Sequence, residues 1–271
     1  MLIVVAKTGN IGSSTVLELL LDERADRNDI DVRVISSGAK MGKAEAEYVA
    51  DETLSLKPDL ILYTTPNASA PGPKLVIEKF AGKKAVVISD APASKMKDTL
   101  EEKGFGYIFV KGDPMIGARR EFLDPTEMAI FNADVLKVLA ATGALRLIQI
   151  EVGKTIDAVK ADKSYLPQIT VDAVRAVEHS NFKDETAKEK AVEAYELSQK
   201  VGEENVRGCF MEKDSEQYIR TVASAHELLR KAANLADEAR EIEKKNDSLY
   251  RTPHSPDGRI LTKTKLMEKP K

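Results

Sequence analysis

The chain of 271 residues has a single cysteine, Cys209, so it cannot form an internal disulfide, and this fits a reducing, cytoplasmic environment. It lacks any apolar run near the roughly 18 residues that a membrane-spanning helix needs. Its N-terminus lacks the charged start and the cleavage site of a signal peptide. Neither charge sign dominates, since 41 Lys and Arg oppose 44 Asp and Glu. We therefore expect neither a membrane nor a nucleic acid as partner.

The sequence also lacks the signatures of several catalytic centres. Its three histidines, His179, His226 and His254, do not fall at metal-ligand spacings, and the cysteine has no CxxC partner, so we expect no metal site. It has no GxSxG nucleophile motif and no GxxxxGK[ST] phosphate loop. His226 lies in a run with helical apolar spacing, which predicts a packed side chain rather than a catalyst. A reaction without a protein nucleophile, such as hydride transfer between two bound organic molecules, fits these absences best.

The first half of the chain alternates between short apolar, β-rich segments and helical patterns. The predicted strands are residues 2–6, 32–36, 60–64, 85–89 and 107–110, and the predicted helices are residues 13–25, 43–57, 73–81 and 93–103. Strands that are almost wholly apolar are typical of a parallel sheet covered by helices on both faces. This alternation predicts a doubly wound, mainly parallel, Rossmann-like α/β domain over residues 1–124.

The second half is mainly helical. Asp124 followed by Pro125 is a typical helix start. We predict a helical bundle over residues 125–245, packed beside the sheet, with a small irregular or β segment. Its helices are predicted over 125–162, 184–203 and 215–245, and its weak strand candidates are 168–171 and 206–211. The net basic tail, residues 246–271, predicts irregular structure that is either solvated or reaches a neighbouring subunit.

The turn after the first strand, KTGNIGSS over residues 7–14, is similar to a dinucleotide-binding fingerprint that has lost one glycine. The usual pattern is G-x-G-x-x-G. Here Lys7 occupies the first glycine position, while Gly9 and Gly12 keep the other two. The backbone amides of residues 10–14 would still open a helix, so the turn predicts an anion site.

The end of the second strand argues against an adenosine dinucleotide as the ligand. A nicotinamide dinucleotide needs an acid there to bind the ribose hydroxyls. The sequence has Ser36 and Ser37 instead. The turn after the first strand is therefore interpreted as an anion site not built for adenosine ribose, with a purely structural turn as the alternative.

Ligands of open α/β sheets bind at the carboxyl ends of the strands, so the other loops there are also candidates. The loop 65–73 is stiffened by proline and glycine. Asp90 is expected to cap a helix that begins near Pro92, with ligand contact as an additional role. The run Arg119–Glu121 follows the fifth strand, where an arginine pair is either a solvated, salt-bridged surface feature or an anion site.

Several longer segments resemble one family, the coenzyme F420-dependent methylenetetrahydromethanopterin dehydrogenases of archaeal one-carbon metabolism. They are GNIGSS (9–14), LLLDERADR (19–27), PNASAPGP (66–73), ISDAP (88–92), residues 95–143, residues 222–244 and RTPHSPDG (251–258). The blocks 111–143 and 222–258 are the most specific, and the stretch 144–210 resembles the family least.

The resemblance implies a reaction and its partners. A hydride would pass from the methylene bridge of the pterin substrate to the deazaflavin F420, giving methenyltetrahydromethanopterin and reduced F420. No metal, flavin or NAD(P) would take part. F420 has no adenosine ribose, which accounts for the missing acid after the second strand. The family also implies a cytoplasmic homohexamer, a trimer of dimers.

The resemblance also implies site residues. F420 would be held by Thr8, Gly9, Asn10, Ile11, Gly12, Ser13, Thr65, Pro66, Asn67, Asp90, Ala91 and Pro92. The pterin or its acidic tail would be met by Lys7, Arg119, Arg120, Glu121, Glu127 and Asn132. Catalysis would come mainly from holding two rings in contact. Because the product pterin is a cation, the carboxylates of Glu121 and Glu127 are the catalytic candidates.

Two other functions stay open. One is a methylene-pterin dehydrogenase that uses NADP, whose phosphate other groups could meet, although the serines after the second strand argue against it. The other is a non-enzymatic α/β binding module. The dense proline and glycine turns at the strand ends argue against a scaffold, which would not need them.

Overall fold

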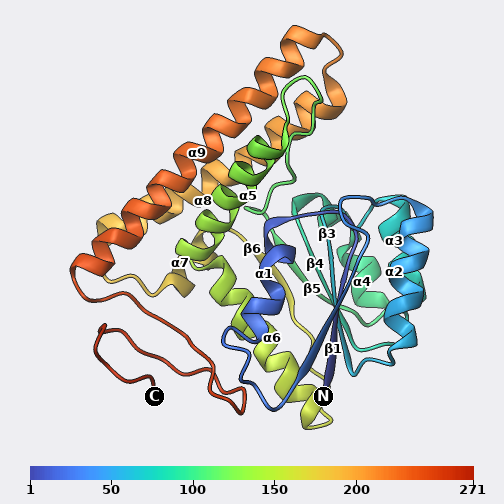
Figure 1. Cartoon of the computed structure of the whole chain (residues 1–271), viewed down its shortest axis with the longest axis vertical. Coiled ribbons are helices and arrows are strands. Elements are labelled where there is room, and N and C mark those ends of the chain that lie inside the picture. The colour runs from blue at the N-terminus through green and yellow to red at the C-terminus, as the bar shows by residue number, and fades with distance from the viewer.

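The computed structural model describes residues 1–271 and contains a six-stranded sheet with helices on both faces (Figure 1). The strands are β1 (Leu2–Lys7), β2 (Asp31–Ser36), β3 (Leu60–Thr65), β4 (Ala85–Ser89), β5 (Gly106–Val110) and β6 (Gln168–Val171). Their order is β2-β1-β3-β4-β5-β6, and every neighbouring pair is parallel. The predicted doubly wound, parallel α/β architecture is confirmed.

Alternation along the strands divides the core into two layers. On β3, Leu60 and Leu62 join one apolar cluster, while Ile61 and Tyr63 join the other, because successive side chains point to opposite faces. The second layer is covered by α2 (Lys43–Ser55), α3 (Pro71–Lys79) and α4 (Lys97–Glu102), which follows the 3-10 helix η1 (Ala91–Met96). The first layer is covered by α1 (Gly12–Leu21) and by helices of the second half.

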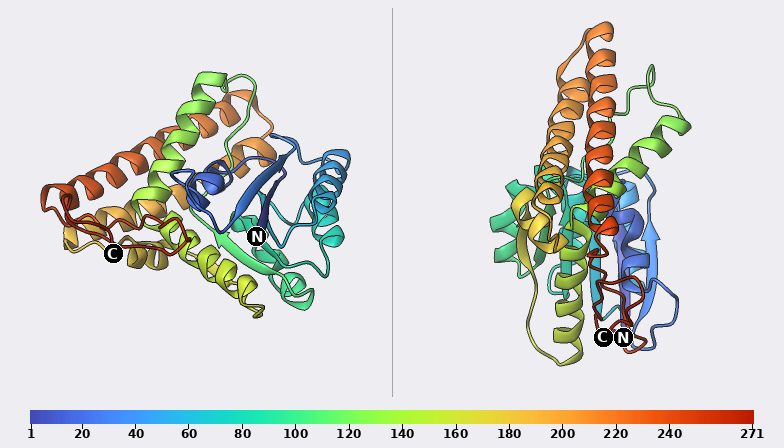
Figure 2. Two further views of the ribbon diagram at one scale, coloured as in Figure 1. Left: turned by 60° about the horizontal axis from the view of Figure 1, so that its bottom comes forward. Right: turned by 90° about the vertical axis from the view of Figure 1, so that its left-hand side faces the viewer.

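The second half contributes α5 (Pro125–Ala141), α6 (Ala144–Lys160), α7 (Ala173–Ser180), α8 (Glu185–Val206), the π-helix η2 (Arg207–Met211) and α9 (Ser215–Lys245). The predicted helical segment 125–162 is broken at Gly143, whose φ of 96° is left-handed. Helices α8 and α9 form a long hairpin that projects beyond the sheet (Figure 2). No single helix is long and apolar enough to cross a membrane, and the pair α5–α6, which reaches that length together, is bent by 69°.

Two strand predictions were wrong in part or in whole. The segment 206–211 is not a strand, because η2 continues α8 and packs Gly208 tightly against Val222 and Thr221 of α9. The second strand, predicted to be buried on both faces, is the edge strand β2, and Val34 is 43% exposed. Local β propensity predicts neither a packing partner nor a position within the sheet.

The segment 168–171, in contrast, is a strand, β6, and pairs with β5 as the other edge of the same sheet. The main apolar cluster also joins strands of the first half to helices α5 to α9. Contacts therefore run across residue 124, and a division of the chain there stays a prediction.

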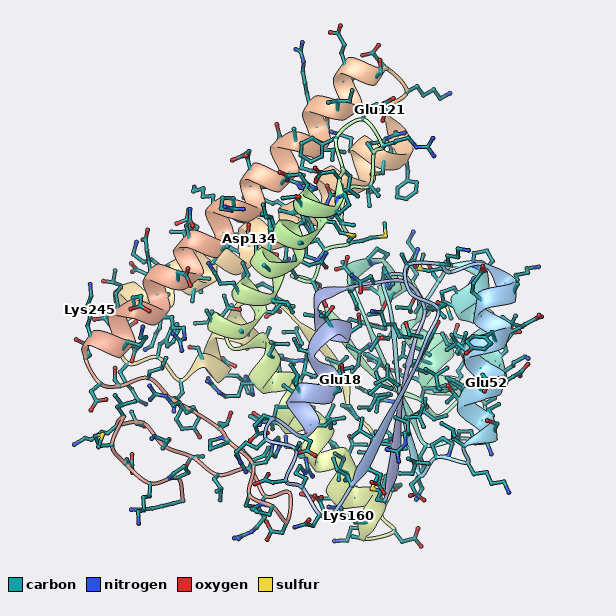
Figure 3. The ribbon with its side chains drawn as sticks, in the orientation of Figure 1. Glu18, Glu52, Glu121, Asp134, Lys160 and Lys245 are labelled. Carbon is teal, nitrogen blue, oxygen red and sulfur yellow. The ribbon has the colours of Figure 1, made fainter.

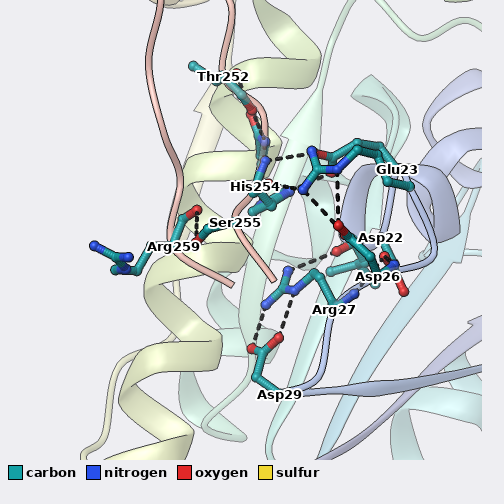
Figure 4. Close-up of polar contacts among 12 residues, drawn as sticks. Asp22, Glu23, Asp26, Arg27, Asp29, Thr252, His254, Ser255 and Arg259 are labelled. Atoms are coloured by element: carbon teal, nitrogen blue, oxygen red, sulfur yellow. Dashed lines mark hydrogen bonds and ion pairs between the residues drawn. The ribbon is translucent and has the colours of Figure 1, made fainter. Parts of the chain in front are cut away.

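The tail after α9 packs back on its own chain (Figure 4). The His254 backbone N–H donates to Glu23 Oε1 at 2.6 Å, and the ring Nδ1 lies 2.7 Å from Glu23 Oε2. Next to this pair, Arg27 forms a two-pronged ion pair with Asp29, at 2.9 and 2.7 Å. His254 is buried, so this part of the tail is irregular, as predicted, but it is not solvated.

Candidate active site

The strand order places a switch point between β1 and β3, where successive connections leave in opposite directions. Ligands of open α/β sheets bind at the carboxyl ends of the strands at such a point. Because the strands are parallel, the loops after β1, β3, β4 and β5 all lie at the carboxyl ends of the strands, on the same side of the sheet (Figure 1). These loops carry most of the residues that the sequence nominated.

Gly9 packs the turn after β1 against two other segments. Its φ is 75°, and its N–H donates to the Lys40 carbonyl at 3.2 Å. A Cβ at this position would lie 2.6 Å from Met41 Sδ and 2.8 Å from Pro66 Cδ. Only glycine satisfies both the left-handed backbone and this close approach. The predicted cofactor residues Gly9 and Pro66 are thus in direct proximity, and Met41 was not predicted.

A buried hydroxyl pair joins the ends of β1 and β3. Thr8 Oγ1 and the Tyr63 hydroxyl share a hydrogen bond of 2.6 Å, and both side chains are buried. The Ser89 hydroxyl donates to the Thr65 carbonyl at 2.6 Å, which links β3 to β4. Tyr63 was missed because it stands in an apolar strand. A tyrosine in such a strand needs a polar partner, and that requirement was the available signal.

The anion predicted at the N-terminus of α1 is part of the chain itself. The Gly12 N–H donates to Asp113 Oδ1 at 2.6 Å, and the Ser13 N–H donates to Oδ2 at 2.8 Å. These two amides are therefore engaged internally, and an anion site for a ligand over residues 10–14 stays a prediction. Sequence analysis could not show the internal contact, because Asp113 is 100 residues away along the chain.

Asp90 caps η1, as the sequence predicted. Its Oδ1 accepts the Ala91 N–H at 2.6 Å, and Pro92 follows within the first turn. The carboxyl group is 4% exposed. Burial, reinforced by the nearby Asp113 carboxylate, raises the pKa of Asp90 well above its ordinary value. The loop after β4 therefore carries a buried carboxyl group whose charged form is disfavoured.

The segment 111–124 is held in place by α8. The Gly112 N–H donates to the Tyr195 hydroxyl at 3.1 Å, and the Ser198 hydroxyl donates to the Gly112 carbonyl at 2.8 Å. Further along, Asn205 Nδ2 donates to the Met115 carbonyl at 2.9 Å. One stripe of α8 thus fixes the start of the segment that carries the arginine pair. The polar residues of that stripe were not predicted.

Arg119 and Glu121 meet the tip of the α8–α9 hairpin. Arg119 Nε donates to the Gly208 carbonyl at 2.8 Å, and its guanidinium lies 3.9 Å from the centre of the Tyr218 ring. The Tyr218 hydroxyl donates to Glu121 Oε1 at 2.8 Å. Glu121 is exposed near this tip (Figure 3). Its own backbone amide and the Tyr218 hydroxyl hold the pKa of Glu121 below its usual value.

The remaining candidates lie on α5, at the end of β1 and the turn after it, and in the segment 111–124. Asn10 Nδ2 donates to Asn132 Oδ1 at 3.2 Å, so the turn after β1 is tied to α5. Lys7 is half-buried, and burial lowers the pKa of its amine. Arg120 is exposed. No three His, Cys, Asp or Glu side chains are grouped to hold a metal ion.

Glu127 is turned toward α9. Its Oε2 lies 3.5 Å from Nδ1 of His226. The His226 ring packs against Phe122 and Phe131 with ring centres 4.7 Å apart in each case. Burial lowers the pKa of His226. His226 is thus a packed residue, as predicted, and it is also the neighbour of a predicted catalytic carboxylate.

Comparisons with known proteins cover the whole chain. A family model described as methylene-5,6,7,8-tetrahydromethanopterin dehydrogenase matches residues 1–271. The F420-dependent methylenetetrahydromethanopterin dehydrogenase of Archaeoglobus fulgidus is 58% identical over 267 residues, which are 98% of this chain and 97% of that one. Its counterpart from Methanocaldococcus jannaschii is 54% identical over 270 residues, 98% of each chain.

A solved structure also matches this chain in three dimensions. It is an F420-dependent methylene-tetrahydromethanopterin dehydrogenase in complex with methylene-tetrahydromethanopterin and coenzyme F420. It matches with a TM-score of 0.97 at 47% identity, over 100% of this chain and 99% of that chain. Sequence, fold and the loops at the strand ends lead to one conclusion: the chain belongs to the methylene-5,6,7,8-tetrahydromethanopterin dehydrogenase family.

Proposed function

We propose that this chain catalyses the reversible transfer of a hydride from methylenetetrahydromethanopterin to coenzyme F420, giving methenyltetrahydromethanopterin and reduced F420. The observation that carries this proposal is the full-length likeness to a dehydrogenase solved with both molecules bound. When bound, F420 supplies the hydride-accepting ring. The protein supplies binding, orientation and electrostatics.

The loops after β1, β3 and β4 are the proposed F420 site. Their candidate residues are Thr8, Gly9, Asn10, Ile11, Gly12, Ser13, Thr65, Pro66, Asn67, Asp90, Ala91 and Pro92. The close packing of Gly9 on Met41 and Pro66 supports a stiff, pre-formed surface. Gly12 and Ser13 contribute to the shape of this loop, because both are buried and their amides are taken by Asp113.

The pterin is proposed to contact Lys7, Arg119, Arg120, Glu121, Glu127 and Asn132. Arg119 acts mainly by holding its segment against η2, since its guanidinium is bonded to backbone carbonyls there. Of the two carboxylates, Glu121 is the better candidate to face the product cation, because it is exposed and its hydrogen bonds lower its pKa. Glu127 is paired with His226.

The test is anaerobic mixing of the purified protein with oxidised F420 and methylenetetrahydromethanopterin, followed by loss of the deazaflavin absorbance. NAD and NADP are run in parallel. Bleaching with F420 alone supports the proposal. Turnover with NADP instead would replace it with the nicotinamide-dependent alternative, and silence with all three would favour a binding module.

We also propose a cytoplasmic homohexamer, a trimer of dimers, with a chain that divides near residue 124 into an α/β part (1–124), a helical bundle (125–245) and a tail (246–271). The free thiol of Cys209 supports the cytoplasmic location. The exposed edge strand β2 offers a surface for contacts between subunits, which supports the homohexamer. Native mass spectrometry tests the subunit number, and limited proteolysis within residues 111–125 tests the division.

A further inference from the structure

The segment 37–42, which joins β2 to α2, lies across the turn that follows β1. Two backbone hydrogen bonds fix it there: the Ser37 N–H donates to the Lys7 carbonyl at 3.1 Å, and the Gly9 N–H donates to the Lys40 carbonyl at 3.2 Å. The Ser37 hydroxyl also donates to the Lys40 carbonyl, at 2.7 Å. The chain therefore leaves the edge strand β2 and passes over the end of β1, next to the switch point between β1 and β3.

Two glycines from other segments make room for this crossing. Gly9 has a left-handed φ, and a Cβ on it would lie 2.6 Å from Met41 Sδ. A Cβ on Gly72, in the first turn of α3, would collide with the Met41 carbonyl oxygen. In a nicotinamide-dinucleotide site, the end of the second strand presents an acid to the ribose. Here that strand end leads instead into a segment that carries Met41 to the base of α3.

The side chain of Met41 reaches the ends of both β1 and β3. The Thr65 hydroxyl donates to its Sδ at 3.7 Å, which fixes the position of the sulfur. The same point above Gly9 that lies 2.6 Å from Sδ lies 2.8 Å from Pro66 Cδ, so the thioether and the proline ring are neighbours. Met41 is only half-buried. Part of its surface is therefore open at the edge of the sheet where ligands bind.

The surface around Met41 is uncharged and largely apolar. The two hydroxyls nearest to it are already engaged within the chain, since Thr8 pairs with Tyr63 at 2.6 Å and Thr65 donates to the sulfur. A thioether is polarizable and packs favourably against aromatic rings, but it is too weak an acceptor to hold the hydroxyls of a ribose. Gly9, Pro66 and Met41 together thus suit the face of a flat ring better than a sugar or a phosphate.

We infer that Met41 is a specificity-determining residue whose thioether packs against the ring of the bound cofactor, and that the loop after β2 is a further element of the cofactor site. Resting on the proposed function, that ring is the deazaflavin of F420. The loop that would carry the ribose-binding acid of a nicotinamide enzyme supplies an apolar contact instead. NADP does not gain this contact.

The first experiment is oxidative footprinting of the unchanged protein. Limited treatment with hydrogen peroxide converts accessible methionines to sulfoxides, and mass spectrometry measures the extent at each position. We expect saturating oxidised F420 to slow oxidation of Met41 by at least about threefold, because a ring packed on the thioether excludes the oxidant. Met267, which is 92% exposed in the tail, is the internal control and should not change. NADP should protect neither residue.

The second experiment compares F420 affinity by calorimetry. Met41→Ala should bind F420 about tenfold more weakly, because it loses the contact with the ring. Met41→Leu is the matched control: it keeps an apolar side chain of similar volume and should stay within about threefold of the unchanged protein. Met41 belongs to none of the three buried apolar clusters, so neither variant removes a core side chain.

The outcomes separate this inference from the proposed function. If F420 binds the unchanged protein but leaves Met41 as reactive as before, or if Met41→Ala binds F420 as tightly as the unchanged protein, the inference is overturned and the proposed function stands. Equal protection of Met41 by NADP overturns the role in specificity. If F420 does not bind the unchanged protein at all, the proposed function fails, and the inference fails with it.

Discussion

Removing the hydroxyl of Tyr195 should destabilise the protein more than its small volume suggests. This hydroxyl accepts the Gly112 N–H at 3.1 Å and donates to the Val171 carbonyl at 2.8 Å. It therefore joins α8 to the ends of β5 and β6. Tyr195 has no solvent exposure, and burial raises the pKa of its hydroxyl far above the ordinary value. The group is neutral at any ordinary pH.

The magnitude follows from the Gly112 N–H, which loses its partner in Tyr195→Phe, whereas the Val171 carbonyl still accepts the Lys111 N–H at 3.2 Å. The phenylalanine ring keeps the packing, including the close contact with Gly112, where a Cβ would lie 2.7 Å from the ring. An orphaned, buried backbone N–H costs about 1–3 kcal/mol. We expect the free energy of unfolding to fall by about 1–3 kcal/mol.

The assay is equilibrium unfolding in urea, with far-ultraviolet circular dichroism as readout. Tyr48→Phe is the matched control, because Tyr48 is 56% exposed on α2, and its loss of a hydroxyl should change stability by less than about 0.5 kcal/mol. If Tyr195→Phe is as stable as this control, the hydroxyl does not lock the segment 111–124, and the reasoning is refuted.

Three further predictions use other parts of the chain. Gly143→Ala should cost at least about 3 kcal/mol in urea unfolding, because the left-handed Cβ would lie 2.4 Å from two backbone atoms of α7; normal stability would contradict this. Burial raises the pKa of Asp113 to about 6 from 3.8, so the folded state binds this proton more tightly than the unfolded chain. Relative to Asp113→Asn, the unchanged protein should therefore gain up to about 3 kcal/mol of stability as pH falls from 7 to 4, and a constant difference would refute the shift. Glu121→Gln should slow F420 reduction in rapid mixing while leaving the unfolding midpoint unchanged; an unaltered rate removes Glu121 from the mechanism.

Local sequence signals were sufficient where a feature depends on neighbouring residues. The caps at Asp90 and Asp124 were predicted from their position before proline, and both side chains accept a backbone N–H at the start of a helix. The packed state of His226 followed from helical apolar spacing. The resemblance to one family led to the proposed reaction. Which nominated residues touch the ligands remains a prediction.

Other features of the site depend on residues distant in the sequence, and no local pattern contains them. The segment 206–211 has strand-like composition, yet the packing of α9 against Gly208 keeps it helical. The pairing of Glu127 with His226 joins residues 99 positions apart on two helices. Long-range contacts of this kind are decided by how helices and strands pack, which propensity does not specify.

The sequence by itself determined a parallel α/β sheet, a helical second half and a turn that had lost the features of adenosine binding. It did so because apolar periodicity, proline and glycine act over a few residues. Only the tertiary structure decided which carboxylate caps the first turn of α1. Folding brings Asp113 to the N-terminus of α1, 100 residues away along the chain, and there its carboxylate meets two free amides. The turn predicted an anion, and the fold supplied it from within the chain.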